Sequence, residues 1–143
     1  MSIERTLCIV KPDAVEKKKQ GHIVQRLLDE GFTVLAMKQI VLSRATAEAF
    51  YAVHQGRPFF PDLINFMTRG PVVVAALERE DAVAHYRRVI GATDPAKADA
   101  GTVRKLYGSN VAENAVHGSD SVENGGQEVA YFFAENELSR PRH

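Results

Sequence analysis

The segment NAVHGSD at residues 114–120 places a histidine, a glycine, a serine and an aspartate next to one another. A Ser-His-Asp hydrolase uses such residues, but its serine and aspartate must approach opposite nitrogens of the imidazole, which sequence neighbours cannot easily do. The chain also has no G-x-S-x-G nucleophile elbow. The alternative is that His117 attacks phosphorus and carries a phosphoryl group, with Ser119 or Glu128 as the acceptor that orients its ring.

A phosphoryl-transfer site must also neutralise the charge of a polyphosphate, which is usually done by arginine and lysine. Three basic residues lie at places where they could do so. Lys11 ends an expected strand, Arg87 lies late in an expected helix, and Arg104 lies in a long loop. The spacing of these residues is not specific on its own, because any chain of this length has similar ones.

The other histidines carry weaker signals. His22, His85 and His143 are interpreted as surface residues, and none has a metal-ligand spacing partner such as H-x-x-x-H. His54 could line a pocket, but its position alone favours a structural role.

Composition limits the class of protein. The chain has 143 residues, 45% of them hydrophobic and 25% charged, which predicts a single domain over residues 1–143. Eighteen basic residues balance eighteen acidic ones, so nothing directs the protein to nucleic acid or to a membrane. The only cysteine, Cys8, lies in an apolar run and is expected to be buried and inert. With neither a signal peptide nor a membrane span in the sequence, we expect a cytoplasmic protein.

The elements that must position these residues follow from periodicity. Short apolar segments predict strands at residues 5–11, 32–42, 71–78 and 128–133. Helices are expected to begin at caps formed by Asp13, Ser43 and Asp81, with a further helix through Leu63 and Met67. The helix after Ser43 is expected to bury Val53, and the lysines at 17–19 are expected on a solvated face. Residues 92–128 appear irregular, and a connection of that length is usually functional.

This order of elements predicts an α+β fold. We expect a ferredoxin-like sandwich, in which helices cover a four-stranded antiparallel sheet and a long irregular loop precedes His117. A doubly wound parallel sheet is the alternative. Neither G-x-G-x-x-G nor G-x-x-x-x-G-K-[ST] follows any expected strand, which argues against Rossmann and P-loop nucleotide sites.

Five segments together carry a resemblance to a known family. They are TLCIVKPDAV (6–15), FYAVHQGRPFF (50–60), GPVVVAALE (70–78), IGATDPAKADAGTVR (90–104) and ENAVHGSDSVENGGQEVAYFF (113–133). In this order they resemble the nucleoside diphosphate kinases, in particular the short bacterial type, over nearly the whole chain. The resemblance implies ping-pong transfer of the γ-phosphoryl group of a nucleoside triphosphate, mainly ATP, to nucleoside diphosphates.

The resemblance also implies roles for individual residues. His117 matches the histidine that is phosphorylated on its δ nitrogen, and Ser119 and Glu128 match the pair that supports it. The positions that match phosphate and ribose contacts are Lys11, Tyr51, His54, Arg87, Thr93, Arg104 and Asn114, so the structural interpretation of His54 is reversed. Phe59 matches the aromatic residue that stacks on the base, with Leu63 and Val111 near it. Such stacking reads little base identity.

The resemblance implies partners as well. Mg²⁺ is expected to arrive on the nucleotide phosphates without a protein metal cage, and the chain is expected to form a homo-oligomer, with a tetramer favoured over a hexamer or a dimer. The chain departs from the family pattern at Lys105 and Leu106, where many relatives have a small residue and an aspartate, so the packing of this loop or a subunit contact could differ. A non-catalytic nucleotide-binding module is the alternative function, and the intact His117, Lys11 and Arg104 argue against it.

Overall fold

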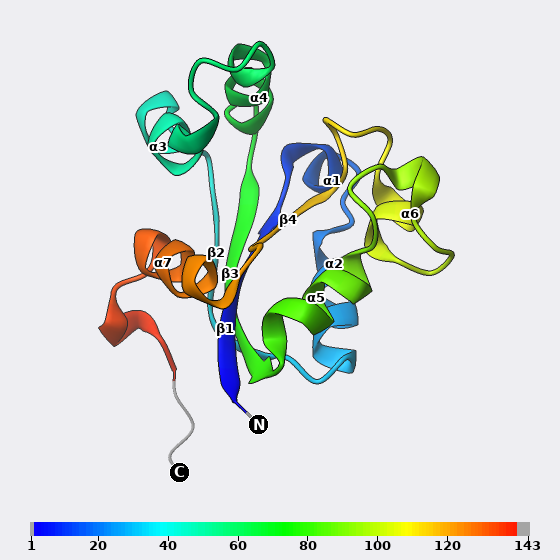
Figure 1. Ribbon diagram of the computed structural model, residues 1–143, viewed down its shortest axis with the longest axis vertical. Coiled ribbons are helices and arrows are strands. Elements are labelled where there is room, and N and C mark those ends of the chain that lie inside the picture. Colours follow the sequence, from blue (N-terminus) through cyan, green and yellow to red (C-terminus); the bar gives the residue numbers. More distant parts are fainter. Residues whose placement is uncertain (1, 140–143) are drawn as a thin grey trace.

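A four-stranded antiparallel sheet forms the centre of the computed structural model, which describes residues 2–139 (Figure 1). The strands lie in the order β2-β3-β1-β4 and span Ile3–Val10 (β1), Thr33–Ile40 (β2), Val72–Glu80 (β3) and Val116–Gly118 (β4). All three strand pairings are antiparallel. The ferredoxin-like α+β prediction is therefore confirmed, and the parallel alternative is wrong.

Seven α-helices surround this sheet in the described part of the chain. They are Pro12–Glu16 (α1), Gln20–Asp29 (α2), Arg44–Phe50 (α3), Phe60–Met67 (α4), Ala82–Ile90 (α5), Val103–Tyr107 (α6) and Val122–Phe132 (α7). Short 3-10 turns cover Ala52–His54, Pro95–Lys97 and Glu135–Glu137.

Helices cover the sheet on both faces, and alternate residues of the central strands point toward opposite faces. On one face Cys8 and Val10 of β1 pack in a core cluster with residues of α2 and α5. On the other face Leu7 and Ile9 pack in a second cluster with residues of α4 and α7. Figure 1 shows α7 on one side of the sheet and α2 and α5 on the other. The buried Cys8 is 0% exposed, and burial raises the pKa of its thiol to about 12, so it is inert as predicted.

The predicted strand at residues 128–133 is wrong, because residues 128–132 belong to α7 and Phe133 is its C-cap. Its apolar residues follow a helical spacing in which Gly125, Val129 and Phe132 are buried against the sheet. The side chain of Ser121 accepts a hydrogen bond from the Asn124 N–H and begins the helix. The aromatic and β-branched content of the segment favoured a strand, but tertiary packing overrides that preference. The fourth strand is β4, which lies inside the region expected to be irregular.

Three helix predictions also need correction. The helix expected from Asp13 onward is divided into α1 and α2, because Lys18 adopts a left-handed φ of 61° between them. Asp13 and Asp81 make no side-chain cap, although Asp81 does occupy the N-cap position of α5. Ser43 caps α3 as predicted, but Val53 is 82% exposed and not buried.

Within residues 2–139, none of the helices has the length and apolar content needed to cross a bilayer.

Candidate active site

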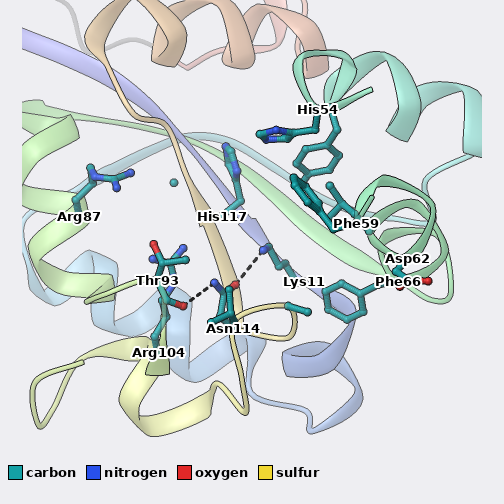
Figure 2. A pocket seen from close by; sticks show the side chains of 15 residues that line it. Lys11, His54, Phe59, Asp62, Phe66, Arg87, Thr93, Arg104, Asn114 and His117 are labelled. Carbon is teal, nitrogen blue, oxygen red and sulfur yellow. Dashed lines mark hydrogen bonds between the residues drawn. The ribbon is translucent and has the colours of Figure 1, made fainter. Parts of the chain in front are cut away.

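The sequence-predicted residues surround one cavity of about 620 Å³ (Figure 2). It lies between β4, α4, α5 and the loop that precedes β4. Of the residues predicted from the sequence, it is lined by Lys11, Tyr51, His54, Phe59, Leu63, Arg87, Thr93, Arg104, Val111, Asn114 and His117. Sequence reasoning missed Asp62, Phe66, Ala112 and Gly118, which complete the wall. Asp62, Phe66 and Ala112 carry no charge-cluster or motif signal that could have singled them out, whereas Gly118 lies within the NAVHGSD motif but was not predicted to line a cavity.

Ser119 and Glu128 do not line the cavity, but they support the Nε2 side of the His117 ring. The Nε2 atom of His117 lies 2.7 Å from Oε1 of Glu128, and Ser119 Oγ donates to the same oxygen at 2.7 Å. The Leu7 N–H in turn donates to Ser119 Oγ at 3.2 Å. A carboxylate only accepts, so Nε2 carries the proton of the neutral imidazole. The Nδ1 atom is therefore left with a free lone pair.

The surroundings of His117 keep its ring neutral. Burial lowers the pKa of the imidazole, and the nearby charges of Lys11 and Arg104 lower it further, while the hydrogen bond and charge of Glu128 act in the opposite direction. The net direction is downward, so the nucleophilic form is favoured at neutral pH.

Tyr86 of α5 fixes the main chain at the same point, and it is a functional residue that the sequence motifs did not single out. Its hydroxyl donates to the His117 carbonyl at 2.6 Å. A Cβ atom on Gly118 would lie 2.7 Å from Cε2 of Tyr86, so only glycine allows this close approach. A buried tyrosine usually finds a partner for its hydroxyl, and that is the signal that could have pointed to such a role.

Lys11, Asn114 and Thr93 form a connected group along the wall of the cavity (Figure 2). Lys11 Nζ donates to Asn114 Oδ1 at 2.9 Å, and Asn114 Nδ2 donates to the Thr93 carbonyl at 3.0 Å. Lys11 is 9% exposed, and burial together with the charge of Arg104 lowers its pKa to about 8. A bound anion would favour the charged form of this amine.

The two arginines of the site are held by main-chain carbonyls. Arg104 donates to the carbonyls of Gly91 at 3.1 Å and of Val116 at 2.9 Å, and its Nε is buried with no hydrogen-bond partner. Arg87 makes a long contact of 3.4 Å to the Ser119 carbonyl. With carbonyl partners and no carboxylate in these contacts, both guanidinium charges stay available to an anionic ligand.

The departure from the family pattern lies outside the cavity. Lys105 and Leu106 belong to α6, and the Leu106 side chain is 56% exposed. Arg104 keeps its contacts to β4 and to Gly91 despite this change.

An aromatic side chain stands at the mouth of the cavity. Phe59 is 46% exposed, and its ring lies 5.4 Å from that of His54. Val111, which is 57% exposed, belongs to the loop that also lines the cavity. A half-exposed aromatic face of this kind suits stacking on a planar heterocycle.

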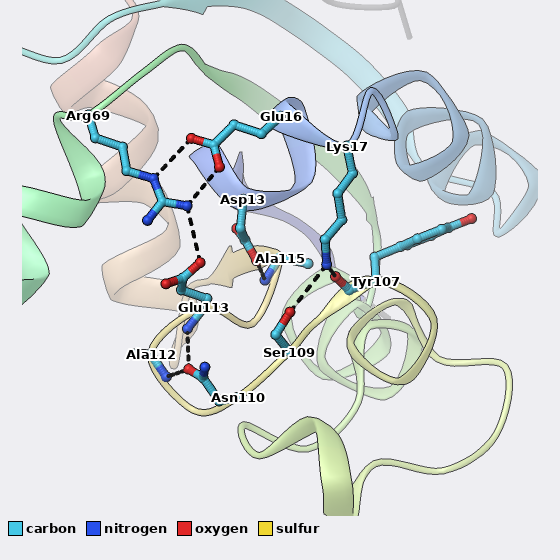
Figure 3. Close-up of polar contacts among 10 residues, drawn as sticks. All are labelled: Asp13, Glu16, Lys17, Arg69, Tyr107, Ser109, Asn110, Ala112, Glu113 and Ala115. Carbon is cyan, nitrogen blue, oxygen red and sulfur yellow. Dashed lines mark hydrogen bonds and ion pairs between the residues drawn. The ribbon is translucent and has the colours of Figure 1, made fainter.

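Ion pairs and hydrogen bonds tie the loop that carries Val111 and Asn114 to α1 (Figure 3). Arg69 binds both carboxylate oxygens of Glu16, at 2.9 and 2.7 Å, and reaches Glu113 at 3.1 Å. Lys17 donates to Ser109 Oγ at 3.2 Å. This part of the region expected to be irregular is therefore anchored.

The remaining histidines lie elsewhere or outside the described residues. His22 is exposed on α2, and His85 pairs with Glu30 at 2.9 Å, away from the cavity. His143 lies outside the described residues. Among residues 2–139, no group of three or more His, Cys, Asp or Glu side chains could hold a metal ion.

Comparison with known proteins gives a consistent result. The family model described as nucleoside diphosphate kinase matches residues 4–138. A nucleoside diphosphate kinase of Sorangium cellulosum is 66% identical over 97% of this chain and 96% of its own. The crystal structure of the Aquifex aeolicus enzyme is 43% identical with a TM-score of 0.93, covering 96% of this chain and 99% of that one. The Halobacterium salinarum enzyme, solved in complex with CDP, is 37% identical with a TM-score of 0.94, covering 99% and 95%.

Proposed function

This chain belongs to the nucleoside diphosphate kinase family and transfers phosphoryl groups between nucleotides, and we propose that His117 is the residue that carries the group. The observation that supports this assignment is the 2.7 Å contact between Nε2 of His117 and Glu128. Because this contact uses Nε2, the free lone pair is on Nδ1, and His117 lines the cavity.

The reaction then runs in two matched steps. In the first, the Nδ1 lone pair attacks the γ-phosphorus of a nucleoside triphosphate, and the bond from that phosphorus to the β,γ-bridging oxygen breaks. The nucleoside diphosphate leaves with the bonding electrons. Glu128 stays hydrogen-bonded to Nε2–H and compensates the positive charge that develops on the ring. In the second step a different nucleoside diphosphate attacks the phosphohistidine through a terminal phosphate oxygen, and His117 is regenerated.

The cationic wall stabilises the charge on the moving group. Lys11, Arg87 and Arg104 place an ammonium and two guanidinium groups around the cavity that His117 lines. Tyr51 adds a hydroxyl that is buried with no hydrogen-bond partner, and burial raises its pKa, so it remains a donor. His54 and Thr93 complete the phosphate side of this proposal. Lys11 and Arg104 are held by hydrogen bonds before the substrate arrives, which reduces the reorganisation that the reaction requires.

The base and sugar would occupy the outer part of the cavity. Phe59 stacks on the base with Val111 and Leu63 beside it, and every nucleobase offers a π-face for that contact. Asn114, held by Lys11, would meet the ribose. Little base specificity follows, so ATP and all nucleoside diphosphates would serve as substrates. The relative solved with CDP is consistent with a pyrimidine nucleotide in such a site.

Mg²⁺ would enter as part of the nucleotide substrate. Among the described residues, the charged ones of the cavity lining are the cations Lys11, Arg87 and Arg104 and a single carboxylate, Asp62, and this set fits phosphates better than a metal held by protein alone. A homo-oligomer, with a tetramer favoured, a cytoplasmic location and a single domain over residues 1–143 remain predictions. Light scattering of the purified protein tests the oligomeric state.

Labelling tests the assignment of His117. Incubation with ATP labelled on the γ-phosphate is expected to give an acid-labile, alkali-stable label on the wild type and none on His117→Ala. His22→Ala is the matched control, because His22 is exposed on α2, and it should label normally. Label that persists on His117→Ala would refute the assignment. A wild type that binds nucleotides but never becomes labelled would favour a binding module.

A further inference from the structure

Asp13 is a buried carboxylate to which the proposed mechanism gives no part. It lies in the first turn of α1, is 2% exposed and does not line the cavity. Its Oδ2 accepts a hydrogen bond from the Ala115 N–H at 3.1 Å (Figure 3), whereas Oδ1 is buried with no hydrogen-bond partner. Burial of a carboxylate is costly, so its presence here calls for a function of the contact that it makes.

That contact falls on a strained turn immediately before β4. Ala115 has a φ of 74°, a region that residues other than glycine rarely occupy. The Val116 N–H donates to the Asn114 carbonyl at 2.9 Å, which closes a three-residue turn with Ala115 at its centre. A γ-turn with positive φ is strained, and it persists only where the surroundings hold it.

The turn is held from both sides of its central residue. Asp13 binds the Ala115 N–H, and the Lys11 N–H donates to the Ala115 carbonyl at 2.8 Å. Lys11 also binds the Asn114 side chain through Nζ. The turn therefore connects Lys11 and Asn114 on one side with His117, two residues further along, on the other.

We propose that Asp13 is a positioning residue, whose carboxylate oxygen holds the γ-turn at Ala115 and so sets the place of Asn114 and His117 in the cavity. The inference rests on the proposed role of His117 as the nucleophile. The feature that matters is an acceptor oxygen at the Ala115 N–H. The net charge of the side chain is secondary in this role, because the Ala115 N–H needs only an acceptor oxygen, which a neutral carboxamide also supplies.

Four variants separate this role from a general contribution to folding. Asp13→Ala removes the acceptor and is expected to slow phosphorylation of His117 at saturating ATP by about 10- to 100-fold, the scale on which misplacement of reacting groups acts. Asp13→Asn keeps an acceptor oxygen in place and should stay within about threefold of the wild type. Asp13→Glu keeps the charge but moves the oxygen by one methylene, so it should be slower than Asp13→Asn. Adding Ala115→Gly to Asp13→Ala should recover at least about threefold, because glycine adopts positive φ without strain.

The measurements are the single-turnover rate of phosphohistidine formation, the affinity for ADP and the melting temperature of each variant. The rate is expected to fall more than the ADP affinity, because stacking on Phe59 does not depend on the turn. A folded Asp13→Ala that reacts at the wild-type rate would overturn the inference, as would a double variant no faster than Asp13→Ala. If Asp13→Ala does not fold, the phosphorylation rates of Asp13→Asn and Asp13→Glu test the inference. A faster rate for Asp13→Glu than for Asp13→Asn would overturn it. Label on the His117→Ala control would instead refute the proposed function.

Discussion

Oε1 of Glu128 lies 2.7 Å from Nε2 of His117, although the two residues belong to different elements, α7 and β4. The same oxygen accepts the Ser119 hydroxyl, so one carboxylate oxygen orders both side chains. The histidine is thereby held in a single tautomer, with its reactive nitrogen on the other side of the ring. The site thus depends on how α7 packs against the sheet as much as on the NAVHGSD segment.

The first prediction concerns the pH dependence of the Glu128→Gln variant. Burial lowers the pKa of His117 below its ordinary 6.5, while Glu128 partly opposes this change. Attack requires the neutral ring, so the wild-type phosphorylation rate should fall only below that ordinary value. Without the carboxylate charge the pKa falls further, and the acid limb of the rate profile should move to lower pH. The plateau should drop on the order of tenfold or more, because the tautomer is no longer fixed.

Single-turnover rates across the acid range provide the measurement for Glu128→Gln. Glu123→Gln is the matched control, since it removes the same charge from an exposed position on the same helix. The control should keep the wild-type profile. An unshifted acid limb in Glu128→Gln would show that the carboxylate does not act on the histidine.

Much of this site can be predicted from the sequence, because the motifs of the site lie within short segments. Contacts between residues far apart in the chain cannot be predicted in this way. His117 and Ser119 could be read from neighbouring residues. Tyr86 could not be assigned its role, because its partner, the His117 carbonyl, lies 31 residues away. Asp13 was expected to cap a helix. It binds the Ala115 N–H instead, and a partner 102 residues away leaves no local pattern in the sequence.

The error in the fourth strand has the same origin. Phe132 and Phe133 favour a strand locally, yet both are buried in the cluster that covers one face of the sheet. The long apolar strands β1 and β3 were predicted well because both of their faces are covered, so their composition alone identifies them. The strand β4 has only three residues and follows the turn at Ala115, which left too little pattern to detect.

A second prediction follows from the lowered pKa of Lys11. The amine of the free protein is charged below about pH 8 and neutral above it. A bound phosphate favours the charged form, so ADP binding should take up a proton and weaken as the pH rises through the pKa, by up to about tenfold per pH unit. Calorimetry at a series of pH values measures both quantities.

The Lys11→Arg variant provides the control for this pH effect. A guanidinium stays protonated throughout the range, so the variant should bind ADP with an affinity that does not change with pH, whatever its absolute value. An equally steep pH dependence in Lys11→Arg would mean that another group is responsible.

A third prediction concerns the base contact. Phe59→Ala should weaken binding by about 1–3 kcal/mol, and by similar amounts for ADP, GDP and CDP, because stacking uses a face common to all bases. Val53→Ala removes a side chain that is 82% exposed and does not line the cavity, so it should leave binding unchanged. Titration calorimetry with the three nucleotides provides the measurement. A loss confined to one base would indicate recognition of the base edge instead of stacking.

The fourth prediction compares two adjacent glycines of α7. A Cβ on Gly125 would overlap the Arg5 carbonyl oxygen of β1. Both sides of this contact are main chain, which cannot shift without disturbing α7 or the sheet. Gly125→Ala should therefore destabilise the fold by about 1–3 kcal/mol. It should also slow phosphorylation, because Glu128 lies on the same helix and would shift away from His117. Gly126 has nothing within 4 Å of such a Cβ, so Gly126→Ala should stabilise the helix by about 0.5–1 kcal/mol and leave the rate unchanged. Urea denaturation with single-turnover kinetics tests both variants. Equal stability of the two would contradict the close packing of α7 on β1 that holds Glu128 in place.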